Sequence, residues 1–103
     1  MGNTRQKPAR LAEKLRQIRN SLELSPNELV RRLGVEDQID NAGISAYETG
    51  LREPTLMILL QYARLANVYM EALVDDDLDL PTNIPAPTKT EGIRRKQPTR
   101  KNR

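Results

Sequence analysis

The chain has 103 residues, which is enough for one domain, and its 17 lysines and arginines exceed its 14 aspartates and glutamates to give a net charge of +3. A basic balance of this kind favours contact with a polyanion such as nucleic acid. Cysteine and histidine are both absent, which excludes disulfide frameworks, Cys/His metal sites and catalytic triads that need an imidazole base. We therefore expect no cofactor, no metal site and no enzymatic function.

No apolar run approaches the ~20 residues that a membrane-spanning helix needs. Residues 1–5, Met-Gly-Asn-Thr-Arg, do not open a signal peptide. The expected location is cytoplasmic, and no membrane partner is predicted.

Positive charge lies at the two ends of the chain. Residues 1–10 carry a net charge of +3, and residues 88–103 carry +6, from seven bases against one acid. Residues 11–87 hold 7 bases and 13 acids, so this middle part is acidic at −6. We predict a basic N-terminal arm (1–8), a folded domain (9–80) and a disordered tail rich in Pro, Lys and Arg (81–103), because the tail has too few aliphatic residues to form a core. Such a tail either contacts a polyanion or only solubilises the protein.

The first two predicted helices follow from apolar spacing and capping residues. Apolar residues recur at spacings of 4, 3 and 4 from residue 11 to residue 22, as on one face of a helix. The next helix begins with Ser25 as its N-cap, Pro26 at its first position and Glu28 closing a capping box. It ends at Gly34, which suits the left-handed residue after a helix end.

Three further helices are predicted downstream. Asp40 or Asn41 caps a third helix that ends at Gly50. A fourth runs from residue 56 to residue 66 and ends at Asn67, and a last short turn covers residues 70–74. The prediction is an all-α chain of five short helices.

The order of these elements resembles the lambda-repressor-like (Cro/XRE-type) helix-turn-helix DNA-binding family over roughly residues 10–74. The matching fragments share the spacing of that family. They are Leu15-Arg16-x-Ile18-Arg19, Leu24-Ser25-x-x-Glu28-Leu29-x-x-x-Leu33-Gly34-Val35, Ile44-Ser45-x-Tyr47-Glu48-x-Gly50, Arg52-x-Pro54 and Leu56-x-x-Leu59-x-x-Tyr62-Ala63.

The resemblance implies a compact five-helix domain that places its third helix in the major groove of double-stranded DNA. Periodicity turns Ile44, Tyr47, Glu48 and Leu51 towards the body, so that the opposite face points outward. By family position, base-edge contacts fall to Asn41, Ala42 and Ala46 on that outward face, which also carries Ser45 and Thr49. Thr49 and Arg52 are expected beside phosphates, and Pro26 and Asn27 lie where the second helix crosses the DNA backbone.

Two features limit this reading face. It has no Arg, Lys or Gln, so few of its side chains can bond directly to base edges. DNA shape or the basic arms then supply much of the binding. The turn before the third helix is about four residues longer than in the family, and its Glu36, Asp37 and Asp40 repel phosphates unless they point away.

Other residues have structural interpretations. Glu48 is interpreted as the partner of Arg19 in a partly buried ion pair. The aspartates at 75, 77 and 79 resemble the start of a calcium loop, but Leu80 and Ala86 stand where that loop needs glycine and glutamate. We therefore interpret the stretch as acidic and solvated.

The fourth helix carries more apolar residues than one face needs. Leu56, Leu59, Leu60 and Ala63 form one stripe, and further apolar residues lie on other faces. The helix is either central and fully buried, or partly exposed as a contact surface, for which a homodimer is the natural candidate. The segment 78–80 alternates like an extended strand and is expected to dock on the body or on a partner.

Two functional hypotheses follow. The first is a transcriptional regulator, associated with the nucleoid, that reads the major groove and adds phosphate contacts through its basic arms. The alternative is a protein-interaction module, such as an antitoxin or accessory factor, that binds a protein partner through the fourth helix and the acidic segment 71–79.

Overall fold

The computed structural model describes residues 7–89, and all of the regular structure in that range is helical. The five helices are α1 (Leu11–Ser21), α2 (Pro26–Leu33), α3 (Asn41–Thr49), α4 (Leu56–Ala66) and α5 (Met70–Val74). The predicted all-α, five-helix fold is confirmed. None of these helices is long and apolar enough to cross a membrane.

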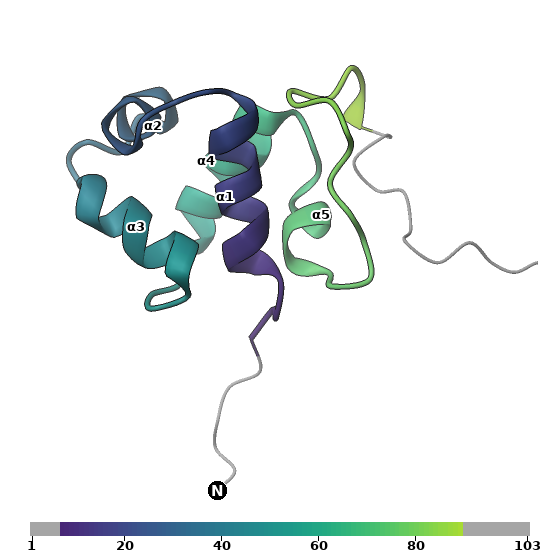
Figure 1. Ribbon diagram of the computed structural model, residues 1–103, viewed down its shortest axis with the longest axis horizontal. Coiled ribbons are helices and arrows are strands. Elements are labelled where there is room, and N and C mark those ends of the chain that lie inside the picture. The colour runs from purple at the N-terminus through teal and green to yellow at the C-terminus, as the bar shows by residue number, and fades with distance from the viewer. Residues whose placement is uncertain (1–6, 90–103) are drawn as a thin grey trace, which may run out of the picture.

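Helix α1 lies at the centre of the fold (Figure 1). It contacts α3 on one side and α5 on the other, while α2 packs against α3 and α4. The core is aliphatic apart from two buried tyrosines, Tyr47 and Tyr62. Its other large members come from every helix: Leu11, Leu15, Ile18, Leu29, Leu33, Ile44, Ile58, Leu59 and Leu73.

The helix ends form as the capping residues predict. The Ser25 hydroxyl accepts from the Glu28 amide at 3.1 Å, and the Glu28 carboxylate accepts from the Ser25 amide at 2.8 Å. Asp40, and not Asn41, caps α3 by accepting from the Gly43 amide at 3.2 Å. Gly34 and Gly50 have φ values of 72° and 81°, which L side chains rarely adopt, so both glycines end their helices as expected.

The N-terminus of α1 is capped from a distant part of the chain. The Asp76 carboxylate accepts from the Ala9 amide at 2.8 Å and from the Arg10 amide at 3.0 Å. These bonds satisfy amides that the helix itself leaves unpaired. The Arg10 guanidinium donates in return to the carbonyls of Asp76 and Leu78 and to the Asp79 carboxylate, the last at 2.7 Å. Asp76 and Asp79 therefore have structural roles and are not simply solvated.

Lys14 is fully buried between α1 and α5. Its ammonium donates to the carbonyl of Ala72 at 2.8 Å and to that of Asp75 at 2.9 Å. Both carbonyls lie at the C-terminal end of α5, where the helix dipole favours a cation. Burial, together with the nearby charge of Arg10, lowers the pKa of Lys14.

The chain after α5 forms a strap, residues 78–86, that packs on the body. Leu78, Leu80 and Ala86 are buried. The Ala86 amide donates to the Ala66 carbonyl at 2.9 Å, and the Asn67 side chain donates to the Ala86 carbonyl at 2.7 Å. The expected docking of residues 78–80 is confirmed.

Residues 81–86, which belong to the predicted tail, lie against the body, and the boundary at Pro81 stays a prediction. One backbone bond to Ala66 and one bond from the Asn67 side chain hold Ala86, Pro81 is buried, and Ile84 packs against the core. The rest of the predicted tail from residue 90 onward, and residues 1–6 of the predicted arm, lie outside the described residues.

Leu51 and the first residues of α4 are more exposed than the helical periodicity predicts. Leu51, predicted to face the body, is 83% exposed. The reason is that α3 ends at Thr49 and the left-handed Gly50 turns the chain away from the helical register. Helix α4 buries Ile58, Leu59 and Tyr62 but leaves Leu56 73% and Met57 62% exposed, so it is not a fully buried helix.

The distant cap predicts a specific loss of stability. Asp76→Ala is expected to lower the free energy of unfolding by about 1 kcal/mol, the usual cost of losing an N-cap. Asp77→Ala, one residue away and exposed, is the matched control and should stay within about 0.5 kcal/mol of the parent protein. Urea denaturation measures both, and equal losses would contradict the capping role.

The same cap predicts a pH dependence. Hydrogen bonds from the Ala9 and Arg10 amides lower the pKa of Asp76. Its stabilising contribution is therefore complete above the ordinary carboxyl pKa of about 3.9 and is lost as the pH falls through the lower folded value. Denaturation across this acidic range should show the difference between the parent protein and Asp76→Ala shrinking, whereas a constant difference would exclude an ionic cap.

Candidate nucleic-acid interface

The outward face of α3 is open to solvent along the helix. Asn41, Ala42, Ser45 and Thr49 are exposed, and Ala46 is half-buried. On the opposite face Ile44 is 0% and Tyr47 3% exposed. Five of the residues expected at DNA therefore share one surface, as the periodicity predicted.

An ion pair fixes α3 against α1. The Arg19 guanidinium donates to both oxygens of Glu48, with Nε to Oε2 at 2.8 Å and Nη2 to Oε1 at 3.0 Å. It also donates to the Leu24 carbonyl at 3.0 Å, just before α2. The hydrogen bond to Glu48 raises the pKa of Arg19. The structural interpretation of Glu48 is thus confirmed, and one guanidinium joins three parts of the helix-turn-helix.

The start of α2 lies beside this arrangement. Pro26 occupies the first helical position and is half-buried, while Asn27 is exposed. A helix N-terminus presents backbone N–H groups and a positive dipole end, which suits a phosphate oxygen. Pro26 has no N–H to donate, so the Asn27 amide is the group at this helix start that suits such a contact.

The lengthened turn between α2 and α3 is ordered and partly apolar. The amides of Gln38 and Ile39 donate to the Val35 carbonyl at 2.9 and 3.1 Å. Ile39 packs against Gly43, where an added Cβ would lie only 3.0 Å from the Cβ of Ile39. This close approach explains a glycine inside α3. Of the three carboxylates in the turn, that of Asp40 caps α3, whereas Glu36 and Asp37 are exposed.

Two cations, Arg52 and Lys7, lie near α3. Arg52 is exposed, and its Nη1 lies 3.7 Å from the Cβ position of Gly43, across the inner side of α3. Lys7 and Pro8 line a cavity of about 100 Å³ together with Tyr47 and Arg52. The chain therefore enters the fold beside the candidate interface. Sequence reasoning placed Lys7 in a basic arm but had no signal for this proximity, which depends on the direction of α1.

The ion pair gives a testable account of how α3 is positioned. Because Glu48 is 7% and Arg19 19% exposed in their side chains, replacing either by Leu leaves its partner unpaired and should cost about 3 kcal/mol of stability. The double variant Arg19→Leu/Glu48→Leu should cost clearly less than the sum of the two single variants. Additive losses in a denaturation cycle would show that the two side chains do not act as a pair.

Comparison with known proteins agrees with this geometry. A family model described as Helix-turn-helix matches residues 15–73, which include the last part of α1, the whole of α2, α3 and α4, and most of α5. Comparisons with curated proteins and with solved structures found no match. The matched region covers more than half of the chain, and its order of helices is that of the DNA-binding module. The chain belongs to the helix-turn-helix family of DNA-binding proteins, of the lambda-repressor-like Cro/C1 type.

Proposed function

We propose that this protein is a transcriptional regulator that acts on nucleoid DNA and inserts α3 into the major groove. The observation that carries the proposal is the open outward face of α3, which presents small and polar side chains while the opposite face is buried. A face without bulky groups can approach base edges closely. Family membership supports DNA binding in general.

Direct readout falls to few groups. The Asn41 amide can pair with N6 and N7 of adenine, and the methyl groups of Ala42 and Ala46 can contact a thymine methyl. Ser45 can donate or accept at either kind of base. Each of these contacts is modest, so we expect sequence preference at only a few base pairs, those closest to the start of α3.

Phosphate contacts supply the remaining affinity. Arg52 and Lys7 stand near α3, and the start of α2 adds the amide of Asn27, since those of Ser25 and Glu28 are used in the capping box. The Thr49 hydroxyl donates to the Ser45 carbonyl at 3.0 Å, so it must rotate before it can donate to a phosphate oxygen. Binding through cations and amides of this kind weakens steeply as salt rises.

A second copy is the partner that we propose for DNA binding. Leu51 and Met57 are large apolar side chains that the single chain leaves exposed to solvent. A dimer of this family reads two half-sites about one helical turn apart. The same exposed side chains support the alternative function, an antitoxin or accessory factor that binds another protein. The internal hydrogen bonds of Asp76 and Asp79 weigh against the acidic segment 71–79 as the partner surface.

Base readout by Asn41 is tested with in-vitro selection of DNA by the full chain. Asn41→Ala should relax preference at one base pair, a loss of about 1–3 kcal/mol in discrimination at that position. Asn83→Ala, which removes an exposed amide from the strap, should leave the selected motif unchanged. An unaltered motif in Asn41→Ala would show that α3 is not read in this orientation, and sequence-blind binding by the parent protein would contradict the proposed regulator.

The phosphate role of Arg52 predicts a different signature. Arg52→Gln should weaken binding to all sequences alike and reduce the slope of log K against log salt by about 1. Arg64→Gln, an exposed cation on α4, is the control. Titrations at several salt concentrations measure the slope, and a change in base preference without a change in slope would assign Arg52 to readout instead.

A further inference from the structure

An apolar groove opens where α1, α4 and α5 meet. It encloses about 320 Å³ and is bordered by Glu53 and Thr55 at one edge. Leu56, one of its walls, is 73% exposed. Its apolar lining consists of Pro8, Leu11, Pro54, Leu56, Leu59 and Val74.

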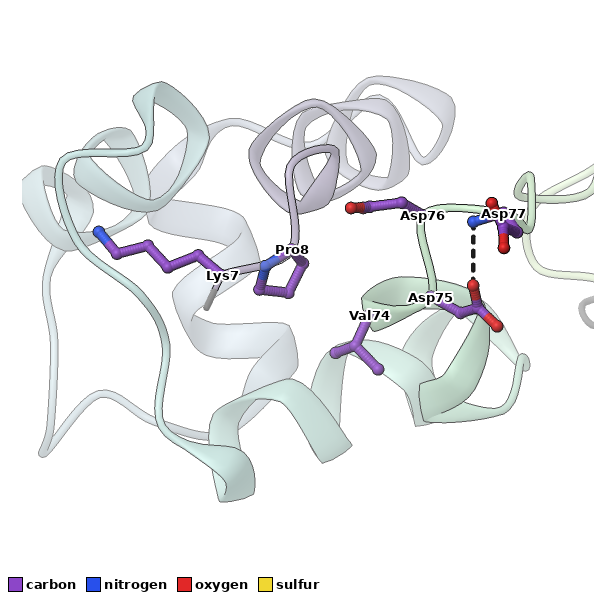
Figure 2. Close-up of a pocket in the computed structure, with 6 residues that line it drawn as sticks. All are labelled: Lys7, Pro8, Val74, Asp75, Asp76 and Asp77. Atoms are coloured by element: carbon purple, nitrogen blue, oxygen red, sulfur yellow. Dashed lines mark hydrogen bonds between the residues drawn. The ribbon is translucent and has the colours of Figure 1, made fainter. Parts of the chain in front are cut away.

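An acidic cavity of about 440 Å³ adjoins this groove and shares Pro8 and Val74 with it (Figure 2). Asp75, Asp76 and Asp77 line its other side, and the Lys7 side chain extends away from them. Both oxygens of Asp76 accept from the amides of Ala9 and Arg10, whereas Asp75 accepts through one oxygen and Asp77 is exposed, so Asp75 and Asp77 are the carboxylates that a cation can reach. The two cavities together suit an apolar side chain followed by cations.

The chain itself contains such a segment. Beyond the strap, Ile93 is the single large aliphatic residue of the tail, and Arg94, Arg95 and Lys96 follow it directly. We propose that residues 93–96 of the same chain dock here, with Ile93 in the apolar groove and the three cations against the aspartates.

Docking would make the tail a competitor of DNA. Arg94, Arg95 and Lys96 cannot contact the aspartates and phosphates at the same time, so duplex DNA must release the segment before using its charge. This consequence rests on the proposed function, whereas the docking itself does not.

A spin label tests the docking directly. The chain has no cysteine, so Thr99→Cys in the full-length protein carries a single nitroxide. We expect enhanced relaxation of the Leu56, Leu59 and Val74 methyl groups and little effect on Val30 and Leu33 in α2. The enhancement should fade as the salt rises from 0.01 to 1 M, because the Debye length falls from about 30 Å to about 3 Å.

Matched variants distinguish docking in the groove from a general electrostatic attraction between the basic tail and the acidic body. Ile93→Ser should weaken docking by about tenfold, equivalent to about 1.4 kcal/mol, and Leu56→Ser should do the same. Pro98→Ser in the tail and Leu51→Ser on the body, an exposed leucine outside the groove, should leave the enhancement intact. Enhancement that survives Ile93→Ser, or that spreads evenly over α2, would overturn the proposal.

Two further samples test whether the groove is filled by the chain's own tail or by that of a second copy, and whether DNA displaces the tail. Mixing nitroxide-labelled protein with isotope-labelled protein that lacks the nitroxide should give no enhancement, and strong enhancement there would assign the groove to a second copy. Adding a random-sequence duplex to the spin-labelled protein should remove the enhancement in the parent. A duplex that binds without removing it would refute the competition, while failure of the duplex to bind would count against the proposed function and leave the docking result standing.

Discussion

The position of α3 depends on one guanidinium. Helix α3 has nine residues, contains a glycine and offers few large side chains to the core, so intrinsic helix propensity does not hold it in place. Arg19 binds both oxygens of Glu48 and the carbonyl of Leu24, which ties α3 and the entry to α2 to the central helix. A buried pair adds little net stability compared with apolar packing. Its value here is geometric, because it fixes the rotation of α3 and therefore which side chains face outward.

The rest of the charge in the body is used in a similar internal way. Asp76 caps α1, Asp79 pairs with Arg10, and the end of α5 holds the ammonium of Lys14. The body is acidic by composition, yet part of that acidity stabilises the contact between α1 and the segment after α5. Net charge therefore says little about where a polyanion binds. Arg52 and Lys7 lie near α3, whereas Asp75 and Asp77 line the acidic cavity on the other side of Pro8.

The sequence predicts those features that depend on residues a few positions apart. Capping boxes, left-handed glycines and apolar spacing locate all five helices and the two faces of α3, because each is a local interaction. Asp76 binds the amide of a helix start 66 residues away, and the strap is held by one backbone hydrogen bond to Ala66 and one from the Asn67 side chain, so no local pattern indicates either. Leu51 was assigned to the wrong side because periodicity was continued through Gly50, where the helix ends. At the candidate interface, the outward face follows from periodicity, but the nearness of Lys7 follows only from tertiary packing.

In the binding mode that we propose, with α3 in the major groove and the basic arms on phosphates, affinity and specificity are separable. The outward face of α3 is uncharged, so any discrimination that it provides should vary little with salt, whereas binding through Arg52 and the basic arms should fall steeply. The exposed carboxylates of Glu36 and Asp37 sharpen this division, since they repel phosphates near the start of α3. A duplex that lacks the preferred bases then has little to offset that repulsion except the arms. If the tail is held in the groove until a duplex displaces it, the arms contribute least when DNA is scarce, and the neutral face then determines which sites are occupied first.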